Sequence, residues 1–137
     1  MLRLLVLLSL PVALSGCGHG CNLMYAPDQL SILFNPPLSG EGEFLLEVEG
    51  DATGACVITL PDAAVCEGDL QVFSDATEVT GLQLYELAPA HLTVSVSKDG
   101  TLLSMQEVSP TYTVDEPNGK GCGERHSAEV ELDPSGG

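Results

Sequence analysis

Tryptophan is absent from this chain of 137 residues, and tyrosine and phenylalanine contribute only three residues each. A hydrophobic core must therefore rest on aliphatic side chains, and the length allows one domain. Basic residues are scarce, because four Lys and Arg stand against 20 Asp and Glu, for a formal net charge of -16. This negative field excludes nucleic acid as a partner and favours cations or basic partners. The simplest interpretation of the acids is that they keep a small surface protein soluble.

An apolar run long enough to span a bilayer, about 20 residues, is also missing. A positive start at Arg3, the apolar run Leu4–Leu14 and the small residues after it are the parts of a secretory signal. The stretch Leu14-Ser15-Gly16-Cys17 then resembles the lipobox of bacterial lipoproteins, which is an aliphatic residue, two small residues and a cysteine. The resemblance implies that residues 1–16 are a signal peptide cleaved before Cys17. It also implies diacylglycerol on the cysteine sulfur and, in many members, acylation of the new amino terminus.

The lipobox resemblance implies an address in the bacterial cell envelope, with the membrane bound through the lipid anchor on Cys17. Two acyl chains give stable anchoring, whereas one gives only marginal binding. Gly18 follows the cysteine, where an Asp retains some lipoproteins at the inner membrane, so the outer membrane is slightly favoured. An ordinary signal peptide with a chance cysteine, or a short buried helix, ranks behind this interpretation.

An odd number of cysteines in an exported protein needs an explanation. The five are Cys17, Cys21, Cys56, Cys66 and Cys122. Lipidation of Cys17 accounts for one and leaves four, enough for two disulfides in an oxidising compartment. Metal binding is the alternative use, but the chain has no Cys-x-x-Cys pair, and zinc sites usually show two paired clusters. Disulfides are therefore favoured over a metal site.

Four cysteines allow three disulfide connectivities, and spacing favours one of them. Cys56 and Cys66 are equidistant from Pro61, so a hairpin turning near Pro61 would place them within bridging distance. The remaining pair is Cys21 with Cys122, which would tie the start of the domain to its last strand.

Alternation of apolar and polar residues dominates the chain after residue 28 and predicts β-strands. The clearest example is 91–97, where Leu92, Val94 and Val96 point inward. About eight short strands, with turns at roughly 8–12-residue spacing, are typical of an antiparallel β-sandwich, Ig-like or transthyretin-like, of about 7–8 strands. We expect a lipidated tether at 17–28, one sandwich domain at 29–133 and a disordered tail at 134–137.

Breaker residues predict where the strands end. The stretch 35–42, with two prolines and two glycines, is expected to be a loop. Asp99-Gly100 predicts a tight hairpin, and the weaker alternation of 102–108 after it predicts a bulge. A further strand is expected at 82–87, and a loop at 115–123.

The segment from Leu87 to Gly100 resembles the "leucine, proline, small residue, aromatic, valine-x-valine, glycine" segment of carboxypeptidase-regulatory-like domains, which are transthyretin-like sandwiches. About fourteen residues match, and His91 stands where an aromatic residue is usual. In such domains the segment is structural, so the resemblance supports the sandwich and implies no activity.

Residues for catalysis are not arranged in a recognisable motif. The histidines are His19, His91 and His126, and no Gly-x-Ser-x-Gly elbow accompanies them. Alternation puts paired carboxylates such as Glu47 and Glu49 on the solvent side of a strand, where charges normally lie. We therefore expect a structural or binding module that is not an enzyme and holds no cofactor. The expected partner is an envelope protein, and a small envelope hydrolase is one alternative function.

Calcium is the other alternative, because Ca²⁺ takes six to eight oxygen ligands, often from loops. Asp115, Glu116 and Asn118 cluster in a loop that contains glycine, and Glu67 and Asp69 lie near Cys66. The Asp-x-Asp-x-Asp-Gly spacing is missing, so ordinary turn residues are the preferred interpretation, and Asp115, Glu116 and Asn118 remain weak calcium candidates.

Overall fold

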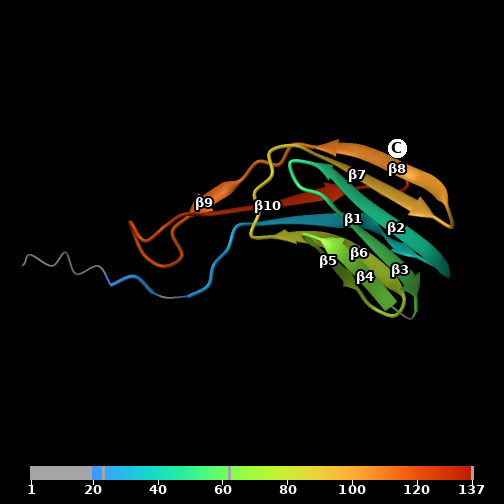
Figure 1. Cartoon of the computed structure of the whole chain (residues 1–137), viewed down its shortest axis with the longest axis horizontal. Helices are drawn as coiled ribbons and strands as arrows, with labels where there is room; N and C mark the ends of the chain where they lie inside the picture. Colours follow the sequence, from blue (N-terminus) through green and yellow to red (C-terminus); the bar gives the residue numbers. More distant parts are fainter. Residues whose placement is uncertain (1–19, 23, 62, 137) are drawn as a thin grey trace, which may run out of the picture.

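The computed structural model describes residues 20–22, 24–61 and 63–136, so Cys17 and the predicted signal segment lie outside the described residues. The described chain forms ten strands and no helix, arranged as two five-stranded sheets that pack face to face (Figure 1). The first sheet has the order β5 (Leu70–Ser74), β6 (Glu78–Tyr85), β1 (Gln29–Ser39), β10 (Arg125–Leu132) and β9 (Thr113–Asp115). The second sheet has the order β4 (Ala63–Gly68), β3 (Gly54–Leu60), β2 (Gly42–Gly50), β7 (Leu92–Lys98) and β8 (Thr101–Val108). The predicted all-β sandwich is confirmed, with ten strands where about eight were expected.

Pairing is antiparallel between every pair of neighbouring strands except one. β1 runs parallel to β10, from Gln29 opposite Ser127 to Phe34 opposite Leu132. The first and last strands of the domain therefore lie side by side in the middle of one sheet. Within the described residues no helix has the length and hydrophobicity needed to cross a membrane.

The core fills the space between the sheets with the inward residues of each strand. It is mostly aliphatic, as expected from the scarcity of aromatic residues. Its largest fully buried side chains are Phe44, Leu30, Ile32, Leu46, Ile58, Leu82 and Leu84. Full burial of one such side chain contributes about 1.5–3 kcal/mol, which makes this layer the main source of stability.

β1 continues through part of the stretch that was predicted to be a loop, and β2 begins at its last residue, so the prediction of a loop over 35–42 is wrong for residues 35–39 and for Gly42. Pairing of β1 with β6 shifts register between Leu33 and Leu38, and Pro36 and Pro37 lie inside this shift. Proline lacks a backbone N–H, and a bulge is one of the few places in a sheet where that donor is not needed. Only the two residues at 40–41 separate β1 from β2.

Two hairpin predictions are confirmed. Asp99 and Gly100 link β7 to β8 with positive φ angles of 48° and 82°, as a tight two-residue turn requires. The expected bulge follows, because the β7–β8 register shifts between Val96 and Ser97.

The strand predicted at 82–87 is displaced toward the amino terminus, since β6 spans Glu78–Tyr85. Asp75 explains its start, because its Oδ1 accepts hydrogen bonds from the backbone N–H groups of Thr77 at 2.7 Å and Glu78 at 2.9 Å. Glu86, with a φ of 64°, turns the chain out of the sheet directly after β6.

Both cysteine pairs favoured from the sequence are joined in the structure. Cys56 and Cys66 are directly opposite in the β3–β4 hairpin, with 4.1 Å between their Cα atoms. Cys21 and Cys122 are bonded across a sequence separation of 101, with 5.6 Å between their Cα atoms.

Candidate functional site

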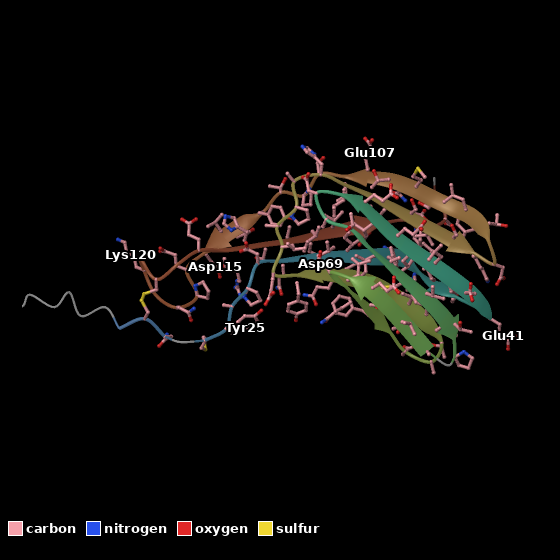
Figure 2. All side chains as sticks on the ribbon, viewed as in Figure 1. Tyr25, Glu41, Asp69, Glu107, Asp115 and Lys120 are labelled. Atoms are coloured by element: carbon pink, nitrogen blue, oxygen red, sulfur yellow. A yellow bond between two sulfur atoms is a disulfide. The ribbon has the colours of Figure 1, made fainter. Side chains whose placement is uncertain are left out.

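The segment that leads into the sandwich is fastened to the loop between β9 and β10. Besides the disulfide of Cys21 with Cys122, the backbone N–H of Asn22 donates to the carbonyl oxygen of Asn118 at 2.9 Å. The side-chain Nδ2 of Asn118 donates to the carbonyl oxygen of Met24 at 2.9 Å. These contacts form a clamp, here called the tether clamp, at the end of the molecule marked by Lys120 and Asp115 in Figure 2, with Glu41 at the opposite end.

Asp28 makes a second attachment, where the leading segment enters β1. Its Oδ1 accepts a hydrogen bond from the backbone N–H of His126 at 2.7 Å and lies 3.2 Å from the Nδ1 of the same residue. These contacts, the backbone hydrogen bond first, hold the pKa of Asp28 below its ordinary value of 3.8. The described part of the predicted tether is thus attached to the domain by a disulfide, backbone hydrogen bonds and a carboxylate.

The three calcium candidates each form hydrogen bonds with different partners, and their oxygens do not converge on one point. Asp115 accepts two hydrogen bonds from Arg125, at 3.0 and 2.6 Å. The Oε1 of Glu116 accepts from the backbone N–H of Gly121 at 2.9 Å, and Asn118 is part of the tether clamp. Among the described residues no three His, Cys, Asp or Glu groups are placed to hold a metal ion.

The outer face of the second sheet carries apolar side chains in a row. The register places Val65 opposite Val57, Val57 opposite Leu45, Leu45 opposite Ser97, and Ser97 opposite Leu102. Successive residues of a strand point to opposite faces, so these positions lie away from the core formed by Phe44, Leu46 and Val96. We call Val65, Val57, Leu45 and Leu102 the apolar stripe.

Carboxylates border the apolar stripe on the same face. Glu67 and Glu47 lie two residues farther along their strands, and Glu49 and Glu107 both lie opposite Thr93 in the following row. Glu43 lies on the other side of the stripe. Figure 2 shows the labelled Glu107 side chain directed away from the sandwich.

The outer face of the first sheet has a different character, because amide and hydroxyl groups cover its centre. Gln83 donates from Nε2 to the Oε1 of Gln29 at 3.1 Å, across β6 and β1. A shallow concavity of about 420 Å³ lies over β10, and its lining is polar apart from Ala128. It is lined by Gln29, Ser31, Thr111, Thr113, Ser127, Ala128 and Glu129. The two outer faces therefore offer neighbouring molecules different chemistry.

A smaller concavity of about 230 Å³ lies at one end of the second sheet and contains His91 and Ser109. The Nδ1 of His91 is 3.0 Å from the Oγ of Ser109, and the backbone N–H of His91 donates to Asp51 at 2.9 Å. Glu49 and Glu107 also line this concavity. A histidine beside a serine hydroxyl was not predictable here, since the two residues are 18 positions apart in the chain and pairing of β7 with β8 brings them together.

Comparison with known proteins found no family model, curated protein or solved structure that matches this chain. The apolar stripe was likewise not predictable from the sequence pattern. Its members come from four different strands, so only the strand registers place them in one line.

Proposed function

We propose that this protein is a lipid-anchored lipoprotein of the bacterial cell envelope whose sandwich is a non-catalytic binding module. The lipobox resemblance of Leu14-Cys17 supports the anchor, and the two disulfides suit an oxidising compartment. The tether clamp is the observation that carries the proposal, because it holds the chain only four residues after Cys17.

The short distance from the anchor to the clamp has a geometric consequence. Four extended residues reach about 14 Å at most, so a lipid on Cys17 would keep the clamp end of the sandwich near the membrane. The end that carries Glu41 would then point away from the bilayer, and the two outer faces would stay open at the sides. Such an arrangement suits the display of a binding surface.

The surroundings of His91 support a non-catalytic role. An activated serine needs a base that is itself oriented by a third group. Among the described residues, the His91 ring has a hydrogen-bond partner only in Ser109, and Asp51 binds the backbone N–H instead of the ring. Within the described residues, the pair therefore lacks the third member of a catalytic triad.

The segment 87–100, which resembles part of a transthyretin-like domain, has a structural role in this sandwich. Leu92, Val94 and Val96 are buried in the core. The hydroxyl of Tyr112 donates to the carbonyl oxygen of Pro89 at 2.7 Å. Burial, followed by the negative charge of Asp28, raises the pKa of Tyr112 to about 12, so the hydroxyl stays protonated as this hydrogen bond requires. The segment holds the sandwich together, as the resemblance implies.

Fractionation of a Gram-negative host that expresses the full chain tests the anchor. We expect the wild-type protein in the membrane fraction and its release by non-ionic detergent, and we favour the outer membrane. Cys17→Ser should leave the product uncleaved or without lipid. Gly20→Ala is the matched control, because an added Cβ there meets nothing within 4 Å. A Cys17→Ser protein that is processed normally and stays membrane-bound would contradict the proposal.

A further inference from the structure

We propose that the outer face of the second sheet docks a basic polypeptide segment, with apolar side chains of the partner on the stripe and its Lys or Arg side chains beside the bordering glutamates. The inference rests on the proposed function for its setting in the envelope. The docking surface itself belongs to the sandwich and does not depend on the anchor.

The apolar stripe is unusual for a solvated sheet face. Val65 is 66% exposed, Leu102 is 54% exposed and Val57 is 40% exposed, although one-sided alternation should put polar residues at these positions. Cross-strand neighbours have Cβ atoms about 4.5–5.5 Å apart, so Val65, Val57 and Leu45 are adjacent across three strands, and Ser97 separates them from Leu102. An exposed apolar patch with a polar rim marks an interaction site more often than single scattered apolar residues do.

The edge strand β8 extends the patch. The register shift in β8 leaves Leu103 as an extra residue, and it is 38% exposed. Met105, opposite Ser95, is 57% exposed. With strands about 4.8 Å apart, the row from β4 to β8 is about 20 Å long, which is enough to accept a short peptide segment or the ridge of a folded partner.

Within the described residues, the carboxylates that border the stripe form no salt bridge with a cation. The mature chain contains Lys98, Lys120 and Arg125 as its cations. Lys98 places its Nζ 5.2 Å from the centre of the Phe44 ring, and Arg125 pairs with Asp115 on the other sheet. Lys120 lies at the tether clamp.

No salt bridge in the described structure involves a carboxylate of this face. The carboxylates of this face are those of Glu43, Glu47, Glu49, Glu67 and Glu107. Rows two residues apart along a strand are separated by about 6.6 Å, so a lysine beside the stripe could reach the glutamates of the next row.

Charge complementarity selects the occupant of the face. A second copy would bring its own glutamates against these and would add another net charge of -16, so self-association through this face is disfavoured. Anionic lipid headgroups are repelled for the same reason. A partner with apolar side chains flanked by Lys or Arg would cover the stripe and neutralise its border at once, which gives both specificity and a fast association rate.

Titration with designed peptides tests the proposal. The probes are fluorescently labelled peptides of alternating Lys and Leu, alternating Lys and Ser, and alternating Glu and Leu, added to the intact protein in non-ionic detergent. We expect the Lys–Leu peptide to bind most tightly and to lose affinity as salt is raised. Hydrogen exchange should show protection confined to the strands of the second sheet.

Substitutions locate the binding surface. Val65→Ser with Leu102→Ser should weaken Lys–Leu binding about tenfold or more, because exposed side chains of this size lose their contact area in the complex. Val114→Ser is the matched control, since Val114 is 50% exposed but lies on β9 of the other sheet. Thermal melting of each variant checks that the sandwich is intact.

Several results would overturn the inference: no binding of the Lys–Leu peptide, equal loss of binding in the Val114→Ser control, or protection confined to the first sheet. Concentration-dependent dimerisation that Val65→Ser with Leu102→Ser abolishes would assign the face to a second copy instead. Binding of delipidated protein to vesicles of phosphatidylglycerol through this face would assign it to the membrane. Peptide binding is measured in solution, so a protein without a lipid anchor can still pass this test. A negative peptide result likewise does not contradict lipidation of Cys17.

Discussion

Asp28 is the residue on which the junction between the leading segment and the sandwich depends most directly. Its carboxylate replaces a strand partner for the backbone N–H of His126 at the start of β10. The same backbone region is fastened on the other side, because the N–H of Glu86 donates to the carbonyl oxygen of Asp28 at 2.8 Å. One residue therefore ties the entry to β1 to the end of β6 and the start of β10.

The lowered pKa of Asp28 makes this junction sensitive to acid. A carboxyl group whose folded-state pKa lies below the unfolded value of 3.8 stabilises the fold above that pH, and the contribution is lost as the pH falls through the folded-state pKa. We therefore expect the free energy of unfolding to decrease as the pH falls below about 4, and Asp28→Asn to flatten this decrease. Chemical denaturation at a series of pH values measures it.

A control separates Asp28 from the other acids. Asp75 and Asp133 also have pKa values lowered by hydrogen bonds, from Thr77 and Ser135 respectively, so some pH dependence should remain in Asp28→Asn. Asp69→Asn is the matched control, because the Asp69 carboxylate accepts no hydrogen bond within the described structure. An unchanged acid profile in Asp28→Asn would refute the assigned role.

Gly81 illustrates a residue whose role the sequence did not reveal. A Cβ built at Gly81 would lie 2.4 Å from the carbonyl oxygen of Ile32, so β1 and β6 approach each other too closely there for any larger residue. A lone glycine within a strand pattern is compatible with a bulge or a close approach, and sequence alone cannot distinguish them. The structure places Gly81 opposite Leu33, immediately before the β1 register shift.

At the scale of elements, the tether clamp should be separable from the sandwich. The disulfide of Cys21 with Cys122 closes a loop of about 100 residues, for which loop-closure entropy gives a stabilisation of about 4–5 kcal/mol. Cys21→Ser with Cys122→Ser should therefore lower the melting temperature. It should also speed amide exchange in residues 20–28, while β2 and β7 keep their protection relative to the global stability.

The clamp experiment has a control within the same loop. Lys120→Ala removes a side chain that makes no hydrogen bond within the described residues, and it should leave both the melting temperature and the exchange rates near those of the wild type. Unchanged exchange at 20–28 in the double cysteine variant would mean that the disulfide does not hold the leading segment in place.

Strands whose faces differ clearly in polarity were predictable from the sequence. In β2 glutamates alternate with Phe44, Leu46 and Val48 except at Leu45, and in β7 hydroxyl residues alternate with valine, so periodicity locates both strands. The far end of β1 was not predictable, because Pro36 and Pro37 normally indicate the end of a strand. Only the register shift between β1 and β6, which the sequence does not reveal, allows them inside a strand. The parallel pairing of β1 with β10 depends on contacts about 100 residues apart, which local patterns do not encode.

The favoured disulfide pairing shows what spacing can establish. Cys56 and Cys66 could be paired because a hairpin at Pro61 makes them cross-strand neighbours, and Cys21 with Cys122 then followed by elimination. The calcium candidates show the limit of the same reasoning. Asp115 and Glu116 are adjacent in sequence, but the structure gives their carboxylates to Arg125 and Gly121.

At the scale of the whole molecule, charge and hydrophobicity are distributed unevenly over two contrasting faces. The centre of the first sheet presents amides and hydroxyls, with Glu129 and Glu131 exposed on β10, whereas the second sheet presents the apolar stripe within an acidic border. Two of the three Lys and Arg residues in the described part of the chain, Lys120 and Arg125, lie at or near the tether clamp. If the clamp end is held at the membrane, this distribution leaves the acidic second sheet free to meet basic partners in the surrounding space.

The covalent state of Cys17 decides whether this protein is lipid-anchored, and one measurement tests it directly. Intact mass spectrometry of the mature protein, purified from the membranes of a Gram-negative host, should show a chain that begins at Cys17 and carries the added mass of diacylglycerol and, in hosts that add it, a further acyl chain. Peptide fragmentation should place that mass on Cys17. A mature chain that begins elsewhere, or that begins at Cys17 without acyl mass, would contradict the account.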